Sequence, residues 1–169
     1  DGASDPSWTA ADIATSADSA WSVFAADMDN DGDMDILSAS YTDDTIAWYE
    51  NDGASDPSWT AADIATSADG ASKVFAADMD NDGDMDILSS SREDDTIAWY
   101  ENTATFIFDP DWTSSDVATS VDGGGPLFAA DMDNDGDIDI VATAFSTDTV
   151  AWYENNGASV PSWTASTIA

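Results

Sequence analysis

The segment VFAADMDNDGDMDIL, from Val23 to Leu37, decides the fold because it returns twice further along the chain. An identical copy begins at Val74, and the variant LFAADMDNDGDIDIV begins at Leu127. A fixed period of about 50 residues is typical of repeat architectures, in which each unit buries its apolar face against its neighbours. The sequence therefore predicts an array of similar units.

Inside one unit, four short apolar stretches are separated by turn-forming Asp, Asn, Gly and Ser residues. No window shows the 3.6-residue apolar period of a helix. Four strands in roughly 40 to 50 residues are typical of a β-propeller blade, whereas the coils of a hairpin solenoid are usually shorter. We therefore predict an all-β propeller of four-stranded antiparallel blades, whose first unit has strands at Val23 to Asp27, Asp35 to Ser40, Thr45 to Glu50 and Trp59 to Ala65.

The repeat divides the chain into three predicted blades, residues 19–69, 70–122 and 123–169, preceded by residues 1–18 as an extra copy of the outer-strand segment. A closed ring needs roughly four to eight blades. We therefore expect further blades from a longer chain or from self-association. Nearly identical units also allow open, head-to-tail assembly into a filament.

The charge of the chain excludes several classes of function. Its 169 residues include 36 acidic and two basic side chains, with no histidine or cysteine, for a formal net charge of -34. Such a polyanion repels nucleic acid and anionic membranes. Disulfides, Cys/His zinc sites and Ser-His-Asp triads are impossible, and no run of 18 apolar residues predicts a membrane span. Only carboxylates remain for acid–base catalysis, and no pair stands out, so we expect a protein that is not an enzyme.

The motif that carries chemistry is D-x-D-x-D-G-x-x-D, which occurs once in each unit. Carboxylates at alternate positions of a tight turn converge on one point, and a cage of hard oxygen ligands suits Ca²⁺ better than Mg²⁺. Glycine supplies a backbone conformation that a β-carbon resists. The sequence predicts three Ca²⁺ sites, at Asp27, Asp29, Asp31, Asp33 and Asp35; at Asp78, Asp80, Asp82, Asp84 and Asp86; and at Asp131, Asp133, Asp135, Asp137 and Asp139.

Two details refine this prediction. At Asp33, Asp84 and Asp137 we expect the main-chain carbonyl, rather than the side chain, to face the ion. An EF-hand is excluded because loop position 12, which needs a bidentate Glu, is Ser38, Ser89 or Ala142, and because strands flank the loop.

In these loops the chain resembles the FG-GAP/VCBS repeat family, the blades of integrin α-subunit propellers and of many microbial surface proteins. The resemblance implies a seven-bladed propeller with Ca²⁺ in the hairpin loop between the first and second strands of a blade. It carries over Asp27, Asp29, Asp31 and Asp35, with their equivalents in the other units, as ligands. The chain has VFAAD in place of the Phe-Gly and Gly-Ala-Pro signatures. It is therefore closer to the VCBS type, and integrin-style ligand recognition is not implied.

Comparison of the three units locates a second candidate site. The metal loops hardly change, whereas the opposite ends of the predicted strands vary and hold both basic residues of the chain. Loops on a rigid scaffold often carry binding, although drift at unconstrained loop tips would also produce this variation. The candidate ligand-contacting residues are Trp21, Tyr41, Lys73, Arg92 and Phe145. Tryptophans that recur at fixed strand positions, such as Trp48 and Trp99, are expected in the core rather than as sugar platforms.

These observations together favour a non-catalytic extracellular module for adhesion or ligand binding, with a protein or glycan as the partner. Two alternatives stay open. The blades could polymerise into a filament or coat, or the clefts between blades could bind glycans as a lectin does.

Overall fold

The computed structural model describes residues 10–103 and 111–169, and all regular secondary structure within them is β-strand. The twelve strands are β1 Ala20–Ala26, β2 Asp35–Ser40, β3 Thr45–Asn51, β4 Trp59–Ala65, β5 Ala71–Ala77, β6 Asp86–Ser91, β7 Thr96–Asn102, β8 Trp112–Ala118, β9 Gly124–Ala130, β10 Asp139–Ala144, β11 Thr149–Asn155 and β12 Trp163–Thr167.

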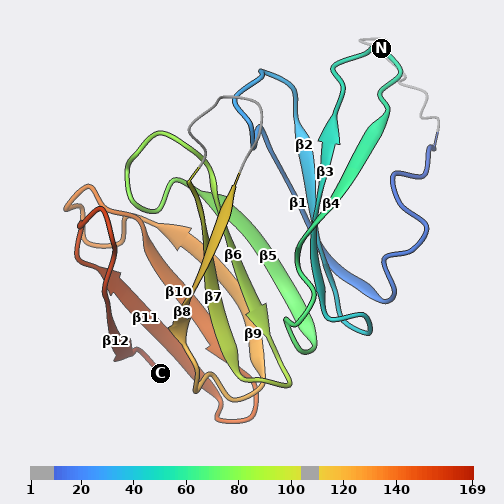
Figure 1. Cartoon of the computed structure of the whole chain (residues 1–169). Coiled ribbons are helices and arrows are strands. Elements are labelled where there is room, and N and C mark those ends of the chain that lie inside the picture. The colour runs from blue at the N-terminus through green and yellow to red at the C-terminus, as the bar shows by residue number, and fades with distance from the viewer. Residues whose placement is uncertain (1–9, 104–110) are drawn as a thin grey trace, which may run out of the picture.

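The strands form three antiparallel sheets, each built from one sequence unit. The strand orders are β1-β2-β3-β4, β5-β6-β7-β8 and β9-β10-β11-β12, so every sheet is a simple meander. Figure 1 shows the sheets side by side in chain order. The predicted all-β fold of four-stranded blades is confirmed, and the three sheets form an open array. We refer to the sheets as blades 1, 2 and 3.

The inner strands β1, β5 and β9, which contact one another across the blades, begin earlier than predicted. The prediction started the first strand at Val23, but pairing with β2 continues back to Ala20, which lies opposite Ser40. The register shifts between Ala20 and Ser22, so Trp21 is the extra residue of a β-bulge. Trp21, and Lys73 in the next blade, therefore lie on strands, where the sequence had placed them in connecting loops.

The hydrophobic core lies between blades. Leu37 and Ile46 of blade 1 share one core with Val74 and Ile87 of blade 2, and all four side chains are fully buried. A second, equivalent core joins blades 2 and 3. Trp48 and Trp99, from the same position of β3 and β7, are buried in these cores, as predicted. Each blade thus depends on its neighbour to cover its apolar face.

The two ends of the array leave equivalent faces uncovered. Val23 of blade 1 is 67 % exposed, while its counterpart Val74 is fully buried against the preceding blade. On blade 3, Met132 is 49 % exposed, while Met28 and Met79 are fully buried against the following blade. One open face therefore lacks the blade that would precede it, and the other lacks the blade that would follow it.

The predicted extra outer-strand segment, residues 1–18, is described only in part. Residues 1–9 lie outside the described residues, and residues 10–18 contain no strand. Asp12 and Ile13 line a cavity with Val23 and Tyr49 on the open face of blade 1. The assignment of this segment to another blade stays a prediction.

Candidate functional site

Each acidic loop connects the first two strands of a blade and has the same backbone shape. In blade 1 the loop turns at Asn30 (φ 59°) and Gly32 (φ 96°), both in the left-handed region. Asn tolerates this region better than most residues, and Gly adopts it without steric cost. The same two turns recur at Asn81 and Gly83 and at Asn134 and Gly136, so the repeated sequence produces three loops of one geometry.

Hydrogen bonds within the loop fix the first carboxylate. In blade 1 the two oxygens of Asp27 accept the backbone N–H groups of Asp31 (3.1 Å) and Gly32 (3.0 Å). The N–H of Asp33 donates to Asp31 Oδ1 (2.8 Å). Blades 2 and 3 repeat these bonds at Asp78 and Asp131. The backbone therefore holds the acidic side chains in place on the concave side of the turn.

Three carboxylates converge in each loop. Their ligand oxygens lie within 4.8 Å of one another in the groups Asp27, Asp29 and Asp31; Asp78, Asp80 and Asp86; and Asp131, Asp133 and Asp135. Oxygen atoms on one Ca²⁺ stand about 2.3–2.6 Å from the ion, so two of them are at most about 5 Å apart. The spacing and the all-oxygen donor set thus fit a calcium ion, and each of the three groups could hold a metal ion.

The last aspartate of each motif has a visible role in joining strands. The carboxylate of Asp35 is buried and accepts the N–H of Met28 (3.0 Å) and the N–H of Asn51 (2.9 Å), which ends β3. Asp86 and Asp139 make the equivalent pairs of bonds. Each carboxylate oxygen has a further lone pair, so this bracing of the loop leaves room for a metal contact.

The aspartate after the glycine turns its side chain away from the other carboxylates and toward neighbouring loops. Asn30 Nδ2 of blade 1 donates to Asp84 Oδ1 of blade 2 (2.9 Å), and Asn81 Nδ2 donates to Asp137 Oδ1 of blade 3 (3.1 Å). A β-carbon at Gly53 would collide with Asp33 Oδ2. The side chains of Asp84 and Asp137 thus link successive loops to one another, and the expected main-chain role of this position stays a prediction.

Burial makes several of these carboxyl groups poor anions in the absence of a counter-ion. Desolvation raises the pKa of Asp29 and of Asp80 to about 6, with further contributions from the neighbouring aspartates. Desolvation also raises the pKa of Asp86 to about 7, although backbone N–H groups of Asn102 and Met79 oppose the shift. A bound divalent cation would reverse this bias, because it stabilises the charged form of each carboxylate.

At the opposite end of the blades, four of the five candidate ligand-contacting residues, all except Lys73, form one row of neighbouring side chains. Trp21 stacks on Tyr41, with ring centroids 4.5 Å apart and planes inclined by 18°. The Arg92 guanidinium carbon lies 5.4 Å from the Trp21 ring centroid and 5.0 Å from that of Phe145. Tyr41, Arg92 and Phe145 hold the same position after the second strand of successive blades. The row therefore crosses all three blades.

A cavity of about 210 Å³ opens beside this row. Its lining consists of Trp21, Ser72, Lys73, Arg92, Gly125, Pro126 and Phe145. The structure thus brings four of the five candidate residues to one cavity. The fifth, Tyr41, lies behind Trp21 and donates its hydroxyl to Glu93 Oε1 (2.7 Å). Sequence comparison did not identify the glycines, whose role is steric: a β-carbon on Gly125 would lie 2.8 Å from the Phe145 ring.

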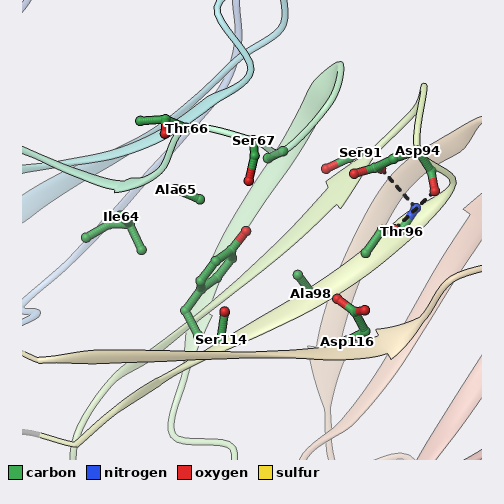
Figure 2. Close-up of a pocket in the computed structure, with 12 residues that line it drawn as sticks. Ile64, Ala65, Thr66, Ser67, Ser91, Asp94, Thr96, Ala98, Ser114 and Asp116 are labelled. Atoms are coloured by element: carbon green, nitrogen blue, oxygen red, sulfur yellow. Dashed lines mark hydrogen bonds between the residues drawn. The ribbon is translucent and has the colours of Figure 1, made fainter.

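A different groove, of about 470 Å³, lies between blades 1 and 2. Figure 2 shows Ile64 and Ala65 at the end of β4, together with Thr66 and Ser67 of the blade connection, on one side, and Ser114 and Asp116 of β8 on the other. A groove of about 320 Å³ occupies the equivalent place between blades 2 and 3. In the first groove the aromatic side chain is Tyr100, which is 5 % exposed. These grooves are repeated features, but neither presents the exposed indole face of the variable end.

Comparison with known proteins agrees with the fold and with the loops. The family model of the FG-GAP-like repeat matches residues 27–89 and 78–142, and each match begins at the first aspartate of an acidic loop. The chain thus belongs to the FG-GAP-like repeat family, whose β-propeller-like repeats correspond to the blades described above. No curated protein matches the chain. Within the described residues, no helix has the length and apolar character to cross a membrane.

Proposed function

We propose that this chain is a non-catalytic β-propeller module, stabilised by calcium, that serves adhesion or ligand binding outside the cell. The observation that carries the proposal is the separation of two kinds of residue between the two ends of the blades. One end repeats an oxygen-lined loop in every blade. The other end places aromatic and basic side chains that differ from blade to blade around one cavity.

Calcium would act on the scaffold rather than on a substrate. The residues that would hold an ion are Asp27, Asp29 and Asp31 in blade 1, Asp78, Asp80 and Asp86 in blade 2, and Asp131, Asp133 and Asp135 in blade 3. Asp35 also joins its loop to the end of β3. The Asn30–Asp84 and Asn81–Asp137 bonds connect successive loops. Ions that order the loops would therefore also order the contacts between blades. Calcium at the millimolar level found outside cells fills even weak sites.

The test is thermal unfolding in Ca²⁺ and in EGTA at equal ionic strength, together with a calorimetric titration. A ligand at one hundred times its dissociation constant adds about 2.7 kcal/mol per site. Three such sites should raise the midpoint by roughly 10 °C or more in a domain of this size. The expected stoichiometry is three ions per chain. An unchanged midpoint together with no heat of binding would reject the structural role of calcium.

A second candidate role is self-assembly, which the two open faces favour. Blade 1 packs on blade 2 through the same kind of face that blade 3 leaves open. Blade 2 contacts blade 1 through the same kind of face that blade 1 itself leaves open at the other end. Asn155 Nδ2 of blade 3 donates to the Met79 carbonyl of blade 2 (2.8 Å), and Asn51 and Met132 hold the matching positions at the open ends. Another blade of the same type would therefore fit either end.

Sedimentation and electron microscopy separate the assembly modes. Closed rings, formed by copies of this chain or by further blades of a longer one, support the binding module. Open strings of subunits support the filament, and a stable single array of three blades argues against both.

Glycan binding between blades is a third candidate, supported by the repeated grooves of Figure 2. A glycan array tests it directly. Binding that survives substitution of Trp21 and Tyr41 would place the sugar in these grooves, and binding that is lost would place it at the variable end. An array without signal argues against a lectin.

A further inference from the structure

The two basic side chains of the chain lie at one cavity. Lys73 and Arg92 both line the space beside the aromatic row, although the chain has 36 acidic residues among which to place them. Both side chains are half-buried. Within residues 10–103 and 111–169, no carboxylate oxygen lies within 4.0 Å of the charged nitrogens of either residue. In a protein with this many carboxylates, two basic side chains without an ionic partner require an explanation.

The nearest acidic side chain in sequence is held elsewhere. Glu93 follows Arg92 directly, but its carboxylate accepts the Tyr41 hydroxyl at 2.7 Å. That hydrogen bond raises the pKa of Tyr41, which keeps the phenol as a neutral donor. Tyr41 therefore contributes to the cavity indirectly, because it engages the carboxylate that could otherwise pair with Arg92.

The Arg92 guanidinium lies close to two aromatic rings. Arg92 lies over both the Trp21 and the Phe145 rings, at 5.4 and 5.0 Å from the centroids. Contacts of this kind use the flat faces of the guanidinium and leave its N–H groups, which point outward in the plane, available. Those N–H groups form a fork that matches a carboxylate in a bidentate arrangement.

The rest of the cavity is rigid and apolar. Ser72 and Ser90 of blade 2 donate hydrogen bonds to the carbonyls of Gly124 (3.1 Å) and Gly125 (2.7 Å) of blade 3, which fixes the floor across the blade interface. Trp21 and Phe145 remain about half exposed, at 52 % and 55 %. Preformed apolar walls with a few fixed polar groups are typical of small-molecule sites.

Size and charge restrict the ligand. A volume of about 210 Å³ is smaller than the roughly 300–1,000 Å³ of pockets for drug-sized molecules, so one ring with a short substituent fits. A net charge of -34 repels dianions and polyanions more strongly than it repels a single negative charge. From these observations we infer that the cavity lined by Trp21, Lys73, Arg92 and Phe145 binds a small carboxylate monoanion that carries a ring.

This inference deepens the proposed binding function and rests on it. In the bound state the carboxylate lies against the Arg92 fork and within reach of the Lys73 ammonium, while the ring of the ligand packs against the exposed parts of Trp21 and Phe145. The free acid, or the same acid as the terminal unit of a glycan, presents the same chemistry to the cavity.

The test uses the calcium-saturated chain with benzoate and glucuronate as probes, followed by saturation-transfer NMR and calorimetry. Benzyl alcohol and glucose serve as neutral counterparts, and phosphate serves as an anion without a ring. At least one carboxylate should bind about tenfold or more tightly than its neutral counterpart. Binding of benzoate alone assigns the cavity to apolar ring acids, and binding of glucuronate assigns it to acidic sugars.

Variants test whether the carboxylate binds in this cavity. Arg92→Gln should lower the affinity for the carboxylate by about tenfold. Lys73→Gln, which leaves the aromatic row intact, should lower it by a smaller factor. Thr113→Asp, on the exposed outer strand β8, makes the same change in net charge as either variant and should leave the affinity unchanged.

The inference is overturned if neither acid binds better than its neutral counterpart, if phosphate binds best, or if both charge-removing variants bind like the original chain. A calcium titration of each sample separates this failure from a failure of the proposed module. Normal calcium binding without carboxylate binding rejects only the assignment of the ligand.

Discussion

The two ends of the blades show what repetition does to a protein. At the metal-loop end, the loops between Ala26 and Asp35 and their two equivalents have nearly the same sequence and the same backbone geometry. At the variable end, the equivalent position of the three blades holds three different residues: Trp21, Ser72 and Gly125. The first end makes the same contact three times, whereas the second combines different residues from three blades into one cavity.

This difference shows that positions that are identical in all blades preserve a loop geometry, whereas positions that differ between blades form a single cavity. A loop in which three carboxylates converge tolerates little change, because the hydrogen-bonded oxygens and the left-handed residues shape the turn. The cavity beside the inner strands depends on different residues in each blade. The same residue in every blade would give the same surface three times. The following predictions would break or sharpen this division, and they run from the largest expected effect to the smallest.

The largest effect is expected from Asp80→Asn in the second metal loop. The variant should bind two calcium ions instead of three, and in Ca²⁺ it should lose about 2–3 kcal/mol of stability, since one site no longer contributes. In EGTA it should be as stable as the original chain or more so, because one partly desolvated charge is removed. Asp63→Asn, on the exposed face of β4, is the matched control and should change neither property. Three ions bound to Asp80→Asn would contradict the assignment.

The next effect is a reversal of pH dependence by calcium. The pKa values of Asp29 and Asp80, about 6, and of Asp86, about 7, lie above the ordinary value of 3.8. Without calcium, the folded form therefore binds protons more tightly than the unfolded form. The resulting stability is complete below pH 4 and is lost as the pH rises toward 7.

When calcium is present, the ion competes with these protons for the carboxylates. The affinity for calcium should therefore fall as the pH decreases from 7 to 5. Melting midpoints across this range, measured in EGTA and in Ca²⁺, should thus have opposite slopes. Parallel profiles would show that the acidic loops do not control stability.

A smaller effect is expected at the contact between metal loops. Asn81→Ala removes the hydrogen bond from Asn81 Nδ2 to Asp137 and should cost about 0.5–1.5 kcal/mol beyond the backbone effect. Asn134→Ala is the matched control because Asn134 has the same left-handed backbone, at φ 64°, and its side chain donates no such bond within the described residues. Equal losses in urea unfolding would mean that the bond between blades contributes nothing.

The smallest effect is expected at the variable end. Tyr41→Phe removes the bond to Glu93 but keeps the ring on Trp21, so stability should change by less than about 0.5 kcal/mol and calcium stoichiometry should stay at three. Thermal unfolding and calorimetry measure both quantities. A loss of several kcal/mol would show that the aromatic row holds the blades together instead of serving a ligand.

The sequence alone determined the architecture. A repeated segment with turn residues at fixed places specifies strands through local propensity and alternation, so β2 and β4 have the predicted bounds and the metal loops have one geometry. The aspartates that converge in a loop are within nine residues of each other, and local chain geometry suffices to bring them together. At Asp33, Asp84 and Asp137 the sequence predicted a main-chain ligand. It did not show that Asn30 and Asn81 of the preceding blades donate hydrogen bonds to the side chains of Asp84 and Asp137.

Only the tertiary structure decided what the variable residues form. Trp21, Arg92 and Phe145 are separated by 71 and 53 residues in the chain, and no local rule relates them. A β-bulge at Trp21 and the close packing that Gly125 allows bring them to one cavity. The physical reason is that packing between blades acts across whole repeats. Its register depends on the cores and bulges of neighbouring sheets, which no short stretch of sequence contains.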